Sequence, residues 1–129
     1  MNFPPGVFSI GLGGLVLDVR GNSNEPGTAI ILWTPKQEGN ENQKWICDGV
    51  VIRNLRSGLV LSVPSLSNGA QLDQQISSSG AETQQFVYNG SISPLADLNL
   101  VLGAQSQEAG SCVSLMPRNG SDLQQWEII

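Results

Sequence analysis

The chain has 129 residues, enough for one hydrophobic core and too few for two independent ones. Six Lys and Arg residues stand against eleven Asp and Glu residues, and the net charge of −5 repels phosphate, so we expect no nucleic-acid partner. Histidine is absent from the sequence, which leaves no Ser-His or Cys-His pair and no usual zinc site, so we expect no enzyme, metal or cofactor.

The N-terminal segment carries no sign of a targeting sequence. No charged-then-apolar leader precedes Phe3-Pro4-Pro5-Gly6, and the longest apolar runs are far shorter than the roughly 20 residues of a membrane-spanning helix. We therefore predict no membrane insertion and a cytoplasmic location, from which any release would follow a non-classical route. In such a reducing compartment, Cys47 and Cys112 are predicted to be free thiols.

Three near-copies of one unit follow one another along the chain. Leu-Val-Leu-Asp-Val at 15–19 returns as Leu-Val-Leu-Ser-Val at 59–63 and as Leu-Val-Leu-Gly-Ala at 100–104. A Gln-x-aromatic element follows each copy, at 43–45, 84–86 and 124–126. We predict a single domain over residues 1–129, built from repeats at about 6–48, 49–89 and 90–129.

Each repeat has the pattern of short strands joined by turns. Apolar residues alternate with period two, and glycines in tight-turn dipeptides, Asp48-Gly49 and Asn89-Gly90, follow the first two Gln-x-aromatic elements. The third copy stops where this turn would begin, so the last strand is expected to pair with the first, around residues 8–10. Three strand-rich units closing on one axis predict an all-β protein with the β-trefoil fold.

The alternation also assigns side chains to faces. Leu15, Leu17 and Val19 are predicted to enter the core, as are their counterparts in the later copies, whereas Asp18 points to the opposite face. The glutamine of each Gln-x-aromatic element is expected to bond backbone groups. The aromatic residues are predicted to fill the centre of the core; they are Trp45, Phe86 and Trp126.

The copies agree on the core and differ on the opposite face. Trp33 stands where the later copies have Gln75 and Met116, and an exposed tryptophan needs a reason. Asn42 stands where they have Thr83 and Leu123. A carboxylate, an aromatic ring and two amides occur together in the first copy alone, as Asp18, Trp33, Asn42 and Gln43.

This first copy resembles the ricin-B-type lectins, which are carbohydrate-binding β-trefoils with a threefold Gln-x-Trp. Leu-Val-Leu-Asp-Val, Ile-Leu-Trp and Asn-Gln-Lys-Trp occur in that family's order and spacing. The resemblance implies that Asp18 accepts hydrogen bonds from vicinal sugar hydroxyls and that Trp33 stacks on the sugar's apolar face. It also implies that Asn42 contacts a hydroxyl and that Gln43 steadies Asp18.

Some positions depart from the family pattern or extend it. Many members have a polar residue where this chain has Ile31, so one hydrogen bond to the sugar is expected to be missing. The loop from Arg20 to Pro26 is a candidate contact for a longer glycan. The cysteine pair that often links each repeat is replaced by Val16 and Pro35, which, with the missing leader, resembles the cytoplasmic mushroom members.

The resemblance implies a lectin for galactose or N-acetylgalactosamine with one working site, in the first repeat. A single shallow site binds weakly, so homodimerisation is the simplest source of avidity. Two alternatives stay open from the residues. One is a trefoil protease inhibitor that presents loops, and the other is a degenerate trefoil that binds protein through Trp33.

Overall fold

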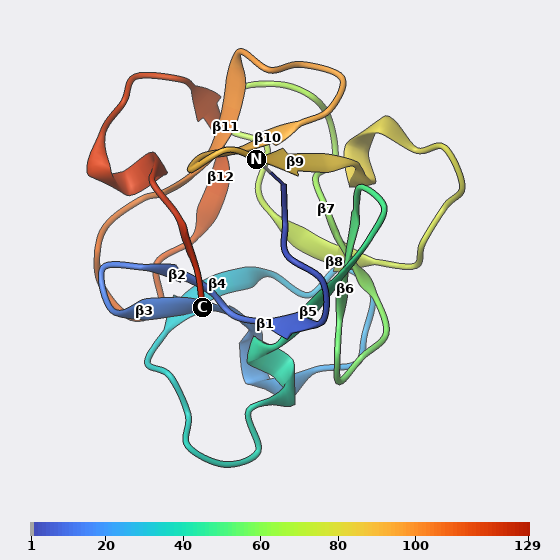
Figure 1. Cartoon of the computed structure of the whole chain (residues 1–129), viewed down its shortest axis with the longest axis vertical. Coiled ribbons are helices and arrows are strands. Elements are labelled where there is room, and N and C mark those ends of the chain that lie inside the picture. Colours follow the sequence, from blue (N-terminus) through green and yellow to red (C-terminus); the bar gives the residue numbers. More distant parts are fainter. Residues whose placement is uncertain (1) are drawn as a thin grey trace.

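The computed structural model describes residues 2–129, and its regular structure is made of short strands and single 3-10 turns. The strands are β1 (Val7–Phe8), β2 (Ile10–Leu12), β3 (Leu15–Val19), β4 (Ile30–Trp33), β5 (Trp45–Asp48), β6 (Val51–Asn54), β7 (Val60–Ser62), β8 (Asp73–Gln75), β9 (Phe86–Tyr88), β10 (Ile92–Pro94), β11 (Leu100–Ala104), β12 (Val113–Pro117) and β13 (Glu127–Ile128). The turns are η1 (Arg20–Asn22), η2 (Glu41–Gln43), η3 (Glu82–Gln84) and η4 (Asp122–Gln124). The successive thirds of the chain lie around a common centre (Figure 1).

Equivalent backbone hydrogen bonds link the three thirds in a ring. Gly27 N donates to the carbonyl of Gln74 at 2.7 Å, Gly69 N to that of Leu115 at 2.8 Å, and Gly110 N to that of Leu32 at 2.7 Å. The three glycines share φ values of 88°, 90° and 91°, in the left-handed region that residues with a side chain rarely adopt. This cyclic pattern is the pseudo-threefold symmetry of a β-trefoil, so the predicted fold is confirmed.

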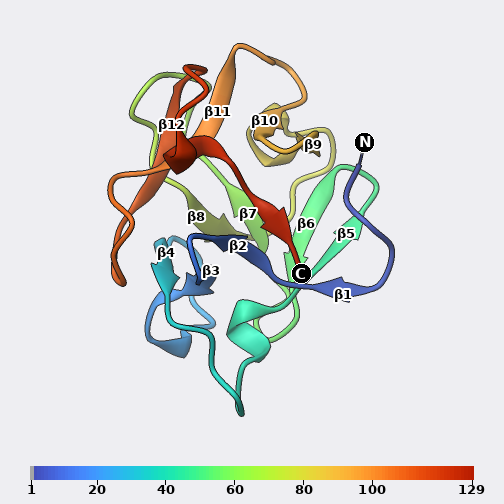
Figure 2. The ribbon, with the colours of Figure 1, turned by 60° about the vertical axis from the view of Figure 1, so that its left-hand side comes forward.

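The two ends of the chain pair with each other and close the structure. Strand β13 lies antiparallel to β2, with Ile128 opposite Ile10, and Ser9 and Ile129 exchange backbone hydrogen bonds of 2.8 and 2.9 Å. Figure 2 shows the red C-terminal strand running alongside β2. The predicted pairing of the last strand with residues 8–10 is confirmed, and it places β2 between β13 and β3 in one sheet.

The core is built as the repeats predicted. Trp45, Phe86 and Trp126 are 0%, 1% and 2% exposed. The indole nitrogens of Trp45 and Trp126 donate to the carbonyls of Leu17 and Leu102, which occupy equivalent positions in β3 and β11. The aromatic side chains therefore connect the centre of the core to β3 in the first repeat and to β11 in the third.

The two faces of β3 are as predicted, and both are largely buried. Leu15 at the start of the strand is half-buried and packs against the core, and Val16 and Asp18 on the opposite face are both 4% exposed. The outer face of β3 is covered because η2 packs against this strand. Alternation correctly separated the two faces, but it could not show that both are shielded from water.

Other predicted features can be located in residues 2–129. Gly49 has a φ of 71° in the turn between β5 and β6, and Cys47 and Cys112 are free and half-buried. In this range, no helix is long and apolar enough to cross a membrane, and no group of three or more His, Cys, Asp and Glu residues is arranged to hold a metal ion.

Candidate functional site

The candidate site lies on the outer face of the β3–β4 pair. Asp18 stands directly opposite Ile31 in this antiparallel pair, and Val16 stands opposite Trp33. Opposed residues project to the same side of a sheet, so Asp18, Ile31 and Trp33 share one face. Leu32, which alternates with them, is fully buried on the core side.

Asp18 is a buried carboxylate held by one glutamine. The Gln43 side-chain amide donates to Asp18 Oδ2 at 2.9 Å and to the carbonyl of Thr34 at 3.0 Å. Its oxygen accepts a hydrogen bond of 2.9 Å from the backbone N–H of Lys36. Gln43 thus fixes both the carboxylate and the loop that follows β4.

The equivalent glutamines show which part of this network is structural. Gln84 donates to the carbonyl of Ile76 at 3.0 Å and accepts from the N–H of Ser78 at 2.8 Å. Gln124 makes the matching pair of bonds with Pro117 and Asn119, both at 2.9 Å. All three glutamines therefore satisfy the backbone of an irregular loop, as expected, and Gln43 adds a bond to a carboxylate.

Asn42 presents an acceptor that has no partner. Its side-chain nitrogen donates to the carbonyl of Val19 at 3.1 Å, which fixes the orientation of the amide, and the residue is 1% exposed. The other amide atom, Oδ1, is buried and accepts no hydrogen bond. An unmet buried acceptor costs about 1–3 kcal/mol, so a donor supplied by a ligand or by water would be favourable here.

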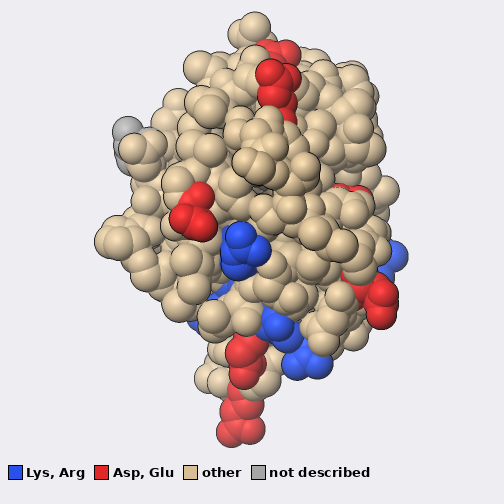
Figure 3. All heavy atoms as spheres, turned by 90° about the vertical axis from the view of Figure 1, so that its right-hand side faces the viewer, with Lys and Arg blue, Asp and Glu red and all other residues tan. Residues whose placement is uncertain are grey.

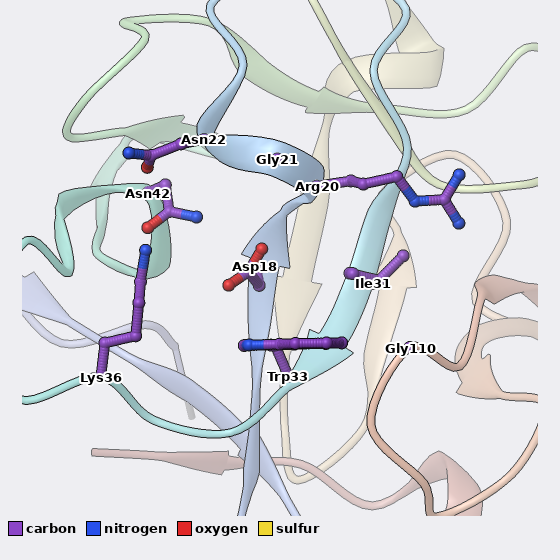
Figure 4. A pocket seen from close by; sticks show the side chains of 9 residues that line it. All are labelled: Asp18, Arg20, Gly21, Asn22, Ile31, Trp33, Lys36, Asn42 and Gly110. Carbon is purple, nitrogen blue, oxygen red and sulfur yellow. The ribbon is translucent and has the colours of Figure 1, made fainter.

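These residues surround a pocket of about 390 Å³. Figure 4 shows the Asp18 carboxylate in the middle, with the ring of Trp33 on one side and Asn42 on another. Trp33 is 43% exposed, and a large exposed aromatic side chain beside a pocket is a feature of binding sites. The lining residues are Asp18, Arg20, Gly21, Asn22, Ile31, Trp33, Lys36, Asn42 and Gly110.

The structure thus brings the predicted residues together, with one difference in position. Asp18, Arg20, Ile31, Trp33 and Asn42 line the pocket, whereas Gln43 lies behind Asp18 and supports it. Ile31 contributes an apolar side chain to the wall, at the position where many ricin-B-type lectins have a polar residue.

Two lining residues, Lys36 and Gly110, were missed by the sequence comparison, and two more, Gly21 and Asn22, were included only as part of the Arg20 to Pro26 loop. Gly21 and Asn22 belong to η1, where φ values of 64° and 61° turn the chain over the pocket. Gly110 comes from the third repeat and reaches Trp33 through the cyclic hydrogen bond to Leu32. The shared glycine at 27, 69 and 110 was a signal for this approach.

The electrostatic environment of Asp18 is balanced between opposing effects. Burial raises the pKa of Asp18 because it disfavours the charged form, while the hydrogen bond from Gln43 and the positive charge of Lys36 lower it. Burial prevails, so the pKa lies above its ordinary value. When ionised, the carboxylate accepts hydrogen bonds only, so it suits a ligand with neighbouring hydroxyl donors.

A family model described as a ricin-type beta-trefoil lectin domain-like family matches residues 6–75, which include the whole of this pocket except Gly110. The chain belongs to this family. A comparison with curated protein sequences gives no match.

Solved structures resemble this ricin-type domain over almost its full length. The earthworm R-type lectin C-half, crystallised in complex with GalNAc, has a TM-score of 0.85 and 27% identity, covering 96% of this chain and 98% of that one. The solution structure of the mdaA-1 domain gives 0.92 and 25%, covering 100% and 92%. The Rhizoctonia solani agglutinin gives 0.80 and 23%, covering 100% and 97%, and supports the fold alone.

Repeats two and three of this ricin-type domain lack the same arrangement, each in its own way. In the second, Ser62 stands where the first has Asp18, the carboxylate of Asp73 lies opposite Ser62 on the partner strand, and Gln75 stands where the first has Trp33. In the third, the side chain of Met116 occupies the space beside Gly103 that a Cβ would need. A buried carboxylate beside an exposed aromatic ring is therefore a feature of the first repeat among the three.

Proposed function

We propose that the domain binds glycans that present galactose or N-acetylgalactosamine, through the pocket of the first repeat. The observation that carries this proposal is the pairing of a buried carboxylate, Asp18, with the exposed ring of Trp33. The carboxylate is an acceptor for two vicinal hydroxyls, and the aromatic plane suits the apolar face formed by the C–H groups of galactose.

Further support comes from the side chain of Asn42 and from the earthworm R-type lectin. Asn42 also lines the pocket, and its amide is held in place by the hydrogen bond to Val19. The earthworm lectin that is 27% identical to this chain was crystallised with GalNAc. The sugar ligand of this relative favours glycan binding over the alternative of a protease inhibitor that presents loops.

The expected affinity is low for a single sugar. A hydrogen bond to a charged group contributes about 1.5–3 kcal/mol and an aromatic contact about 1 kcal/mol, so after the cost of association a monosaccharide should bind at around millimolar strength. Useful avidity then requires more than one pocket per particle, and we propose a homodimer as the source. Sedimentation velocity at increasing concentration tests this, and a strictly monomeric protein would exclude it.

The test compares matched carboxylates. GalNAc and lactose titrations, followed by NMR, should show binding that Asp18→Asn abolishes and that Trp33→Ala weakens about fivefold or more. Asp73→Asn removes the carboxylate that lies opposite Ser62 in the second repeat, and Gln75→Ala changes the counterpart of Trp33; both residues lie outside the pocket lining, so these variants should leave binding intact.

Two results would contradict the proposal. One is binding that survives Asp18→Asn but is lost in Asp73→Asn, and the other is a galactoside-soaked crystal with the sugar in a later repeat. Inhibition of a trypsin-like or papain-like protease, with no glycan bound, would favour the inhibitor alternative.

A further inference from the structure

The charges around the pocket differ from those of the whole molecule. The chain has a net charge of −5, and only 13% of its residues are charged. Figure 3 shows a face made mostly of uncharged residues, with charged side chains scattered over it. In contrast, the ionisable residues that line the pocket are one carboxylate, Asp18, and two cations, Arg20 and Lys36. The pocket therefore carries more positive than negative side chains.

The positive charge of Lys36 acts on Asp18. Its backbone N–H donates to Gln43, its carbonyl accepts a hydrogen bond of 3.2 Å from Asn40, and its charge lowers the pKa of Asp18. Its side chain points toward Asn42, beside the carboxylate (Figure 4). Lys36 thus compensates the negative charge that the pocket already contains, and the charge of Arg20 remains.

Arg20 lies across the pocket from Lys36. Its guanidinium extends past Ile31 and away from Asp18 (Figure 4). The backbone at this point is well fixed, because Arg20 N donates to the carbonyl of Ala29 at 3.2 Å and Arg56 Nε donates to that of Asn22 at 3.0 Å. A rigid turn therefore presents an exposed guanidinium at the rim, where a group attached to the bound sugar would lie.

We propose that the pocket prefers galactosides that carry an anionic group, a carboxylate or a sulfate, and that Arg20 binds this group. The proposal rests on the function proposed above, since Asp18 and Trp33 must hold the galactose ring. A neutral galactoside can accept hydrogen bonds from Arg20 but offers no opposite charge to pair with it. A carboxylate or sulfate matches the planar fork of guanidinium donors. This direct ion pair outweighs the repulsion between the ligand and the acidic residues elsewhere on the protein, because salt screens charges at longer distances.

The experiment measures a ratio of affinities. Dissociation constants for lactose, sialyllactose and sulfated lactose are measured on the same protein. Each anionic ligand is used in two forms, which differ in the position at which the anionic group is attached to galactose. At low ionic strength we expect at least one anionic ligand to bind about two- to fivefold more tightly than lactose, the range for an exposed ion pair. This ratio should fall toward one as salt is added. A preference for carboxylate or for sulfate alone identifies which group the site takes.

Two variants assign the preference to a residue. Arg20→Gln should reduce the ratio to about one. Arg53→Gln removes the same charge from an arginine that does not line the pocket, and should leave the ratio unchanged. Comparing ratios within each variant cancels any general loss of affinity or folded fraction.

The outcomes separate the two proposals. If lactose binds in an Asp18-dependent way but neither anionic ligand is preferred, or if the preference survives in Arg20→Gln, this inference fails and the proposed function stands. If none of the galactosides binds, both fail.

Discussion

The three equivalent glutamines allow one prediction to be worked out from the structure. Replacing Gln84 or Gln124 by alanine removes two hydrogen bonds to the backbone and should reduce the free energy of unfolding by about 2–4 kcal/mol. Gln43→Ala removes the same two bonds and also the bond to Asp18 Oδ2. Hydrogen bonds to charged groups contribute about 1.5–3 kcal/mol, so Gln43→Ala should cost about 1.5 kcal/mol more than the other two.

This additional loss should depend on pH. Burial already raises the pKa of Asp18 above its ordinary value of 3.8, and removing the Gln43 hydrogen bond raises it further. The ionised carboxylate therefore destabilises the folded variant more than the folded parent, at any pH above the raised pKa. As the pH falls through that pKa, the folded variant takes up a proton, and the additional loss should disappear.

Urea unfolding of the three variants at neutral and acidic pH tests this reasoning. The backbone bonds are common to all three glutamines, so their contribution cancels in the comparison. The reasoning would be refuted if Gln43→Ala were no less stable than Gln84→Ala at neutral pH, or if the difference between them persisted unchanged in acid.

Three further predictions concern binding. Galactoside affinity should fall as the pH drops through the raised pKa of Asp18, and pH-dependent titrations should show a midpoint above 3.8; a constant affinity down to that pH would contradict the role given to the carboxylate. Trp33→Ala should weaken binding by about fivefold or more, from about 1 kcal/mol of aromatic contact, whereas Trp33→Phe should retain most of it. Because Trp33 is 43% exposed and Trp45 and Trp126 are buried, sugar binding should shift the tryptophan emission of the parent but not of Trp33→Phe.

The fold was predictable because the repeats constrain it three times over. The strand that contains Leu17 recurs with the same core positions at Leu61 and Leu102, and each copy ends in a buried aromatic residue. A single copy would have been ambiguous, since short apolar runs do not distinguish strands from other buried segments. Positions where the copies differ, such as Trp33, could be recognised as candidate site residues for the same reason.

The remaining parts of the pocket depend on contacts that a comparison of repeats does not contain. Lys36 enters the pocket because its N–H bonds Gln43, which sets the path of the loop after β4. Outside the pocket, Asp73 lies opposite Ser62 through the strand register, which an alignment of separate motifs does not reveal. Both placements are fixed by pairing in space, and no motif along the chain signals them.

The hydrogen bond from Gly110 to Leu32 has a consequence for how the protein acquires its pocket. One wall belongs to a residue that the ribosome adds late, so the pocket around Asp18 and Trp33 is complete only after the final third of the chain has docked. Under the proposed function, ligand binding would therefore report on completion of the whole trefoil.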